Sequence, residues 1–146
     1  MDPIIDSFFS PKNMAVVGVS HSRESMGNAI VKTLFKSGYK VFPIHPDGGN
    51  IGGISCLKSL EELPVGVSSL VVATSPKNAS EIVELARNAG IKKIWFQQGA
   101  NFRGIVEKAK ESGMVVISRK CVLLYAQPVS GIHSVHRFFA QIFRRL

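Results

Sequence analysis

Short apolar runs alternate with segments of helical periodicity along most of the chain, and this alternation limits the fold more than any other feature. Five such runs, each bounded by polar residues, Gly or Pro, cover residues 14–19, 40–44, 68–73, 93–96 and 114–117. A continuous apolar run of this length is typical of a strand that is buried on both faces, as in a parallel sheet. The alternation therefore predicts one parallel, doubly wound α/β sheet of about five strands.

Helices are expected between and after these runs, because apolar residues recur there at spacings of three and four. The expected helices cover residues 27–37, 59–63, 77–89, 101–112 and 131–146. Three of these expected helices are directly followed by a glycine, which commonly ends a helix. These glycines are Gly38, Gly90 and Gly113. The last helix is amphipathic with a basic polar face. We expect it to dock on the sheet, on a second copy of the chain or on another protein, with a membrane-surface helix as the alternative.

The composition is that of one globular domain over residues 1–146, with 45% apolar residues to build a core. Two cysteines, Cys56 and Cys121, form no disulfide framework and lack metal-ligand spacing, so no metal is expected. No apolar run approaches the roughly 18–20 residues of a membrane span. The N-terminal sequence MDPIIDSFF has no basic region of the kind that begins a secretory signal, so a cytoplasmic protein is expected.

The formal net charge of +8 points to an anionic partner: a phosphorylated small molecule, a nucleic acid or a membrane surface. Residues 1–102 carry ten basic and eight acidic side chains, whereas residues 103–146 carry eight basic and two acidic ones. The basic residues are dispersed and are not interleaved with aromatic residues, so neither a nucleic-acid nor a membrane partner is expected.

The loops that leave the carboxyl ends of the expected strands are the candidate binding site, because open parallel sheets bind ligands there. The first loop offers suitable groups for a phosphate. Gly18 supplies a tight turn, Ser20 and Ser22 supply hydroxyl groups, and Arg23 supplies a charge. Gly27 permits a close approach at a helix start, where free N–H groups and the helix dipole favour anions. A polar surface loop with packing glycines is the alternative interpretation.

The second strand ends with Ile44, His45 and Pro46, and this ending argues against a simple NAD site. Such a site needs an acidic residue at the strand end to bind the ribose hydroxyl groups, and Asp47 lies beyond the proline. NADP or coenzyme A satisfies this ending better. No catalytic set emerges from the sequence. Cys121, just after the last strand, is either an ordinary small residue or a reactive thiol.

Several segments together resemble a known family. They are SPKNMAVVGVS at 10–20, GYKVFPIHP at 38–46, IWFQQG at 94–99, and Cys121. In this order they resemble the small single-domain CoA-binding proteins, which are similar to the N-terminal CoA-binding domain of the succinyl-CoA synthetase alpha subunit. The resemblance covers roughly residues 8–121 and implies a Rossmann-like fold.

The resemblance also implies a set of residues that contact coenzyme A. They are Gly18, Ser20, Ser22, Arg23, Gly27, Ile44, His45, Pro46, Thr74, Ser75, Pro76, Gln98 and Gly99. The first loop would follow the diphosphate and pantetheine, and the residues after the second strand would lie near the adenosine. The residues after the third strand would flank the nucleotide, and those after the fourth would face the thiol. Cys121 matches a cysteine of many relatives, in which an Asp-Arg pair precedes it. Here Ser-Arg-Lys precedes it.

The synthetase forms acyl-CoA through a phosphohistidine on a second domain and needs a separate nucleotide-grasp subunit. A single domain is therefore expected to bind coenzyme A or acyl-CoA without ligase activity of its own. Two alternatives remain open: an NADP-dependent or acyl-CoA-processing enzyme, and a basic protein that binds nucleic acid or a membrane surface.

Overall fold

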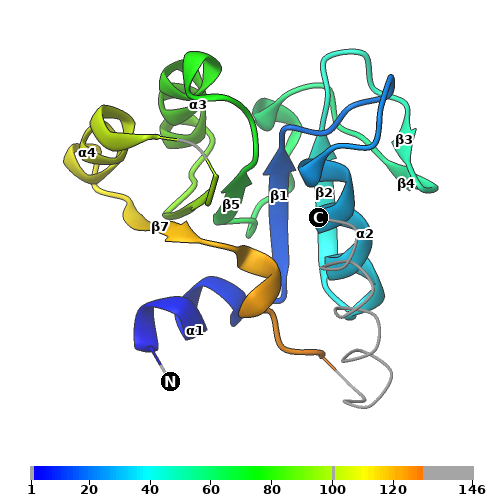
Figure 1. Cartoon of the computed structure of the whole chain (residues 1–146), viewed down its shortest axis with the longest axis horizontal. Coiled ribbons are helices and arrows are strands. Elements are labelled where there is room, and N and C mark those ends of the chain that lie inside the picture. The colour runs from blue at the N-terminus through cyan, green and yellow to red at the C-terminus, as the bar shows by residue number, and fades with distance from the viewer. Residues whose placement is uncertain (1, 100, 130–146) are drawn as a thin grey trace.

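The strands and helices follow one another in the alternating order that the apolar runs predict. The structure is a computed structural model that describes residues 2–99 and 101–129 (Figure 1). The helices are α1 (Pro3–Phe9), α2 (Met26–Lys36), α3 (Pro76–Asn88) and α4 (Arg103–Glu111), with the 3-10 helices η1 (Leu60–Glu62) and η2 (Val122–Leu124). The strands are β1 (Asn13–Val17), β2 (Lys40–Ile44), β3 (Asn50–Ile51), β4 (Ile54–Ser55), β5 (Ser69–Val72), β6 (Lys93–Gln97) and β7 (Val115–Lys120).

Five strands form one parallel sheet in the order β2-β1-β5-β6-β7, which confirms the predicted Rossmann-like α/β fold. The chain runs from β1 outward to β2 and then returns past β1 to β5, so the winding reverses between β1 and β5. The register places Val17 beside both Ile44 and Val72, so these three strands end at the same edge. An open parallel sheet binds its ligands at this edge, at the point where the winding reverses.

Different helices cover the two faces of the sheet. α1, α2 and η2 pack on one face, and α3 and α4 pack on the other (Figure 1). Consecutive residues of β6 show the division, because Trp95 belongs to the first core and Phe96 to the second, and both are fully buried. This burial on both faces explains why the strands are continuous apolar runs in the sequence.

Helix α1 is an element that the sequence analysis did not assign. Asp2 begins it as the N-cap, accepting a hydrogen bond from the Ile4 N–H at 2.8 Å, and Pro3 occupies the first helical position. The Ser69 hydroxyl donates to the Phe8 carbonyl at 2.9 Å and thereby fixes the helix to the start of β5. α1 closes the end of the sheet that lies opposite the candidate site.

The glycine-rich segment that follows β2 contains the short hairpin β3–β4. Asn50 pairs with Ser55 and Ile51 with Ile54, and Gly52 and Gly53 form the turn with φ values of +56° and +87°. Two positive φ values in a two-residue turn give the twist that a hairpin needs, and glycine adopts them without strain. The sequence analysis assigns no strand here, because the pairing depends on a turn rather than on an apolar run.

Helix boundaries shift by a few residues from the predicted ones. α4 begins at Arg103, two residues later than expected, with Phe102 as the N-cap residue, and the Asn101 Oδ1 accepts from the Arg103 N–H at 3.1 Å. The predicted helix at 131–146 lies outside the described residues. None of the helices in the described part of the chain is both long and apolar enough to cross a membrane.

Candidate ligand-binding site

Two glycines close the turn between β1 and α2, where the winding of the sheet reverses. Gly18 has a φ of +105°, and a Cβ atom there would lie 2.5 Å from the Ala73 carbonyl carbon. A Cβ atom on Gly27 would lie 2.3 Å from the Gly18 carbonyl oxygen. The first turn of α2 therefore packs directly on the exit of β1. The close approach observed at Gly27 is to the chain itself, and its approach to a ligand stays a prediction.

Asn28 braces the loop between β1 and α2 from the inside. Its Oδ1 accepts from the Ser20 N–H at 2.8 Å, and its Nδ2 donates to the carbonyl oxygens of Ser20 at 2.8 Å and Arg23 at 3.3 Å. Ser25 is the N-cap of α2, and its hydroxyl oxygen accepts from the Asn28 N–H at 3.1 Å. Because Asn28 is buried, these bonds hold the loop in one shape before any ligand arrives.

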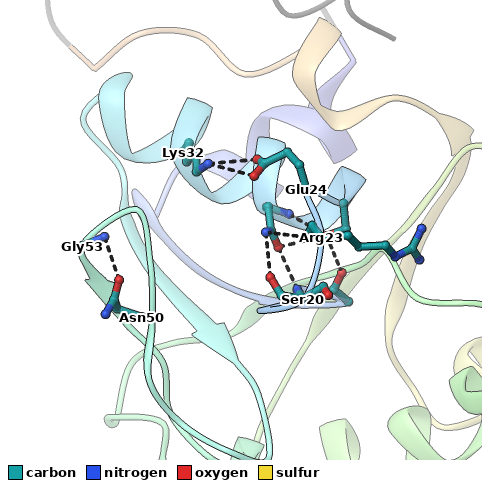
Figure 2. Close-up of polar contacts among 9 residues, drawn as sticks. Ser20, Arg23, Glu24, Lys32, Asn50 and Gly53 are labelled. Atoms are coloured by element: carbon teal, nitrogen blue, oxygen red, sulfur yellow. Dashed lines mark hydrogen bonds and ion pairs between the residues drawn. The ribbon is translucent and has the colours of Figure 1, made fainter.

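Arg23 projects from this braced loop as an exposed cation. Figure 2 shows its side chain extended away from the ion pair between Lys32 and Glu24, whose Nζ and Oε1 atoms lie 2.9 Å apart. Across residues 2–99 and 101–129, no carboxylate lies within ion-pair distance of Arg23. The hydroxyl groups of Ser20 and Ser22 lie 3.1 Å apart beside it. The loop thus presents a free guanidinium group and two hydroxyl groups, a set that suits a phosphate.

Three adjoining hollows follow the carboxyl edge of the sheet. The middle one, of about 450 Å³, lies at the reversal point between β1 and β5. A second, of about 340 Å³, shares Arg23 with it and extends to the β3–β4 hairpin. A third, of about 260 Å³, shares Thr74 and Ser75 with the middle hollow and extends to Gln98 and Gly99. Because neighbouring hollows share lining residues, together they form one path along the edge.

The start of α3 forms a wall of the middle hollow. Ser75 is the N-cap residue, its side chain makes no capping hydrogen bond, and Pro76 occupies the first helical position. Pro76 has no N–H group, and the Asn78 N–H donates to the Ser75 carbonyl oxygen at 3.2 Å, so this helix start favours an anion mainly through the positive end of the helix dipole. The structure brings Thr74 and Ser75 to the same hollow as Gly18, Ser20 and Arg23.

The loop after β2 is tied to the loop after β1. The His21 Nε2 donates to the Gly48 carbonyl oxygen at 2.7 Å, and the His21 ring lies 4.2 Å from the His45 ring, measured between centroids. The His45 Nδ1 accepts from the Asp47 N–H at 3.1 Å, which leaves its Nε2 to carry the proton of the neutral ring. Residues 44–46 line none of the three hollows. Their contact with an adenosine group stays a prediction.

Cys121 lies under the end of β6, with 3% of its surface exposed. The Gln97 Nε2 donates to its Sγ at 2.9 Å, and the Gln97 Oε1 accepts from the Val122 N–H at 3.0 Å. This packing shields the thiol from the hollows. Access of a reagent to it would require the Gln97 contacts to open.

Cys56 follows the hairpin and is half-buried. Burial raises the pKa of the Cys56 thiol, so the protonated and less nucleophilic form predominates at neutral pH. Across the residues that the structure describes, no group of three His, Cys, Asp or Glu side chains is arranged to hold a metal ion.

Asn28, His21 and Lys32 contribute to the site in the structure but are not among the residues predicted for it. For Asn28 a signal existed, because Ser25 precedes it by three residues at the start of a helix, in the spacing of a capping box. For His21 none existed, because its partner Gly48 lies in a loop that is distant in the sequence.

A parallel sheet with a polar path across its reversal point defines the class of nucleotide-binding α/β domains. Within that class, residues 12–127 match the family described as CoA binding domain. The chain belongs to this family.

Solved structures and curated sequences also match this chain over most of its length. A protein from Pyrococcus horikoshii OT3 superposes with a TM-score of 0.73 and 30% identity, over 82% of this chain and 84% of that one. A protein from Pyrococcus furiosus has a TM-score of 0.72 and 32% identity, over 78% of this chain and 98% of that one. The alpha subunit of acetate–CoA ligase [ADP-forming] I from Pyrococcus furiosus is 29% identical over 123 residues, or 80% of this chain. The match spans about a quarter of that subunit's length.

Proposed function

We propose that the chain binds coenzyme A or an acyl-CoA along the carboxyl edge of its sheet. The observation that carries the proposal is the path of three hollows with Arg23, which has no carboxylate partner among the described residues, at the junction of two of them. Membership of the CoA binding domain family supports the choice of ligand. Coenzyme A is long and flexible and carries charged phosphate groups, so it fits an elongated path better than a compact ligand does.

Suitable groups line this path for the diphosphate and for the thiol end of coenzyme A. The diphosphate would lie in the middle hollow, between Arg23 and the start of α3, where a guanidinium group and the positive end of the helix dipole favour phosphate oxygens. The adenosine would lie toward His45 and the hairpin. The pantetheine would pass Thr74 and Ser75, and its thiol would reach Gln98 and Gly99.

We further infer that binding occurs without ligase activity in this chain. The Pyrococcus furiosus structure supports a module of this size, because the match covers 98% of that chain. The Bacillus subtilis protein YneT also supports it, at 24% identity over 76% of this chain and 82% of its own length. An assay with acetate, coenzyme A and ATP should therefore give no acetyl-CoA above the protein-free rate. Formation of acetyl-CoA by an activity that copurifies with this protein would contradict this part of the proposal.

Calorimetric titration of the purified protein with coenzyme A, acetyl-CoA, NADP and NAD, side by side, tests the ligand. Saturable binding of coenzyme A or acetyl-CoA, with weaker binding of both dinucleotides, is the expected result. Tight binding of NADP with no response to coenzyme A would overturn the proposal in favour of a dinucleotide protein. Native mass spectrometry of the protein as purified is an independent check, because a ligand that copurifies is identified by its mass.

A further inference from the structure

A cavity of about 780 Å³ lies between α4 and the end of β7, beyond the path assigned to coenzyme A. Gly99 and Phe102 line both this cavity and the hollow at the expected thiol end, so the two adjoin. The ligand proposed above would therefore have its thiol directed at the entrance of this cavity. Whatever group the thiol carries has space there.

The walls of the cavity combine a small apolar part with a basic part. Phe102 and Val106 supply the apolar part next to the entrance. Arg103, Lys110 and Arg119 supply three cations, against the single acid Glu107. The Glu107 Oε1 lies 4.0 Å from the Lys110 Nζ and offsets that charge. Within the described ranges, Arg103 and Arg119 have no carboxylate within ion-pair distance.

The chain holds Arg119 at the cavity in a backbone conformation that non-glycine residues seldom adopt, with a φ of +62°. The register of β6 and β7 shifts at this point, from Trp95 opposite Ile117 to Gln97 opposite Lys120. The Trp95 Nε1 donates to the Lys120 carbonyl oxygen at 2.9 Å and fixes the strand end after the bulge. A bulge redirects the residue it contains, and strain of this kind is held at functional sites more often than elsewhere.

From this geometry we propose that the cavity binds the acyl group of an acyl-CoA whose far end carries a carboxylate. The aliphatic part would pass Phe102, and the carboxylate would bind the guanidinium groups of Arg103 and Arg119, which match its planar geometry. This inference rests on the proposed function, since it needs the thiol end of coenzyme A at Gly99. It adds a preference among thioesters that the proposed function does not contain.

Titration with coenzyme A, butyryl-CoA and glutaryl-CoA tests this preference, because the two thioesters differ mainly by a terminal carboxylate. We expect glutaryl-CoA to bind at least about tenfold more tightly than butyryl-CoA, from charge-assisted bonds to two arginines. The double variant Arg103→Gln, Arg119→Gln should lose that preference and keep its affinity for coenzyme A. Arg87→Gln is the matched control, because Arg87 is an exposed arginine of α3 that lines none of these cavities, and it should keep the preference.

The possible failures are distinguishable. Absence of binding for coenzyme A and both thioesters would overturn the proposed function and this inference with it. Binding of coenzyme A with equal affinities for butyryl-CoA and glutaryl-CoA in the unaltered protein would overturn this inference alone. The comparison of butyryl-CoA with glutaryl-CoA uses the unaltered protein, so it tests the inference even if the double variant does not fold.

Discussion

Gly27 shapes the candidate site indirectly, by allowing helix α2 to pack against the end of β1. The sequence predicts that its lack of a side chain admits a ligand, whereas the structure uses it to bring α2 against the Gly18 carbonyl oxygen. Both readings concern the same close approach at a helix start, and sequence alone does not distinguish them. The distinction matters, because a side chain here would displace the whole loop that carries Arg23.

Gly27→Ala should therefore destabilise the protein and weaken binding together. The added Cβ would lie 2.3 Å from the Gly18 carbonyl oxygen, a backbone atom with little freedom to move. We expect a loss of about 1–3 kcal/mol in the free energy of unfolding, as for other overpacked sites, measured by urea denaturation.

Gly104→Ala provides the matched control. Gly104 occupies the second position of α4, as Gly27 does in α2, and nothing lies within 4 Å of a Cβ atom built there. Alanine at this position should stabilise the protein by about 0.5–1 kcal/mol, because glycine is the poorer helix former. Equal effects of the two substitutions would show that the contact between Gly27 and Gly18 is not the cause.

Arg23→Ala tests the charge at the junction of two hollows. An exposed side chain without an ion-pair partner among the described residues contributes little to folding, so stability should be unchanged. Affinity for coenzyme A should fall by about 1.5–3 kcal/mol, the usual contribution of a charge-assisted hydrogen bond, as measured by calorimetry. Arg87→Ala should leave the affinity unchanged, and an unchanged affinity in Arg23→Ala would remove Arg23 from the binding site.

At the scale of elements, the sequence predicts well where periodicity is long and poorly where it is short. Four strands of the large sheet and helices α2, α3 and α4 carry apolar patterns along most of their length, whereas the apolar run of the fifth strand, β7, ends at Ile117 and the strand continues to Lys120. α1 is too short for such a pattern, although Asp2 and Pro3 form a recognisable helix start. The hairpin has two-residue strands, and only the Gly52-Gly53 pair marks it.

The same limit applies to the candidate site. Loop positions follow from the order of strands, so the sequence places Gly18, Arg23 and Thr74 at one edge, and the structure brings them to one hollow. Contacts between loops do not follow from that order. The bond from His21 to Gly48 and the bracing by Asn28 depend on side-chain directions that periodicity does not contain.

Phe8→Ala tests whether α1 is part of the folded core. Phe8 is fully buried, and its ring packs edge-to-face on Trp95 with centroids 5.2 Å apart. Removing it should cost about 3–5 kcal/mol in the free energy of unfolding, measured by urea denaturation. Ile4→Ala, on the same helix but 49% exposed, should cost much less. Similar small losses for both variants would mean that α1 does not pack on the sheet.

At the scale of the whole molecule, the net charge and the site are distributed differently. The excess of basic residues lies in residues 103–146, whereas the phosphate groups would lie on loops from the nearly neutral first part. Electrostatic attraction of an anionic ligand by the molecule as a whole therefore adds to the local contacts of Arg23 without replacing them. Arg103 and Arg119 belong to the basic part, which is consistent with a second anionic group at the far end of the same ligand.

Tyr39 connects the start of β2 to the last described segment and makes the stability of the molecule depend on pH. Its hydroxyl group donates to the Gln127 carbonyl oxygen, and the residue is 5% exposed. Burial raises the pKa of Tyr39 above its ordinary value of 10.0. The folded protein therefore holds this proton more tightly than the unfolded chain does. The resulting stabilisation is complete below pH 10.0 and is lost as the pH rises through the higher folded pKa.

Tyr39→Phe removes the titrating group and should change this pH dependence in a defined direction. Below about pH 9 the variant should be less stable by about 1 kcal/mol, because a hydrogen bond to a carbonyl group is lost. Above about pH 10 that difference should shrink, because only the unaltered protein then loses stability through Tyr39. Urea denaturation of both proteins from pH 7 to 11 measures it, and the lysine titrations that occur in the same range cancel in the comparison. A difference that stays constant across the range would show that Tyr39 ionises equally in the folded and unfolded chains, and that the segment around Gln127 does not bury it in solution.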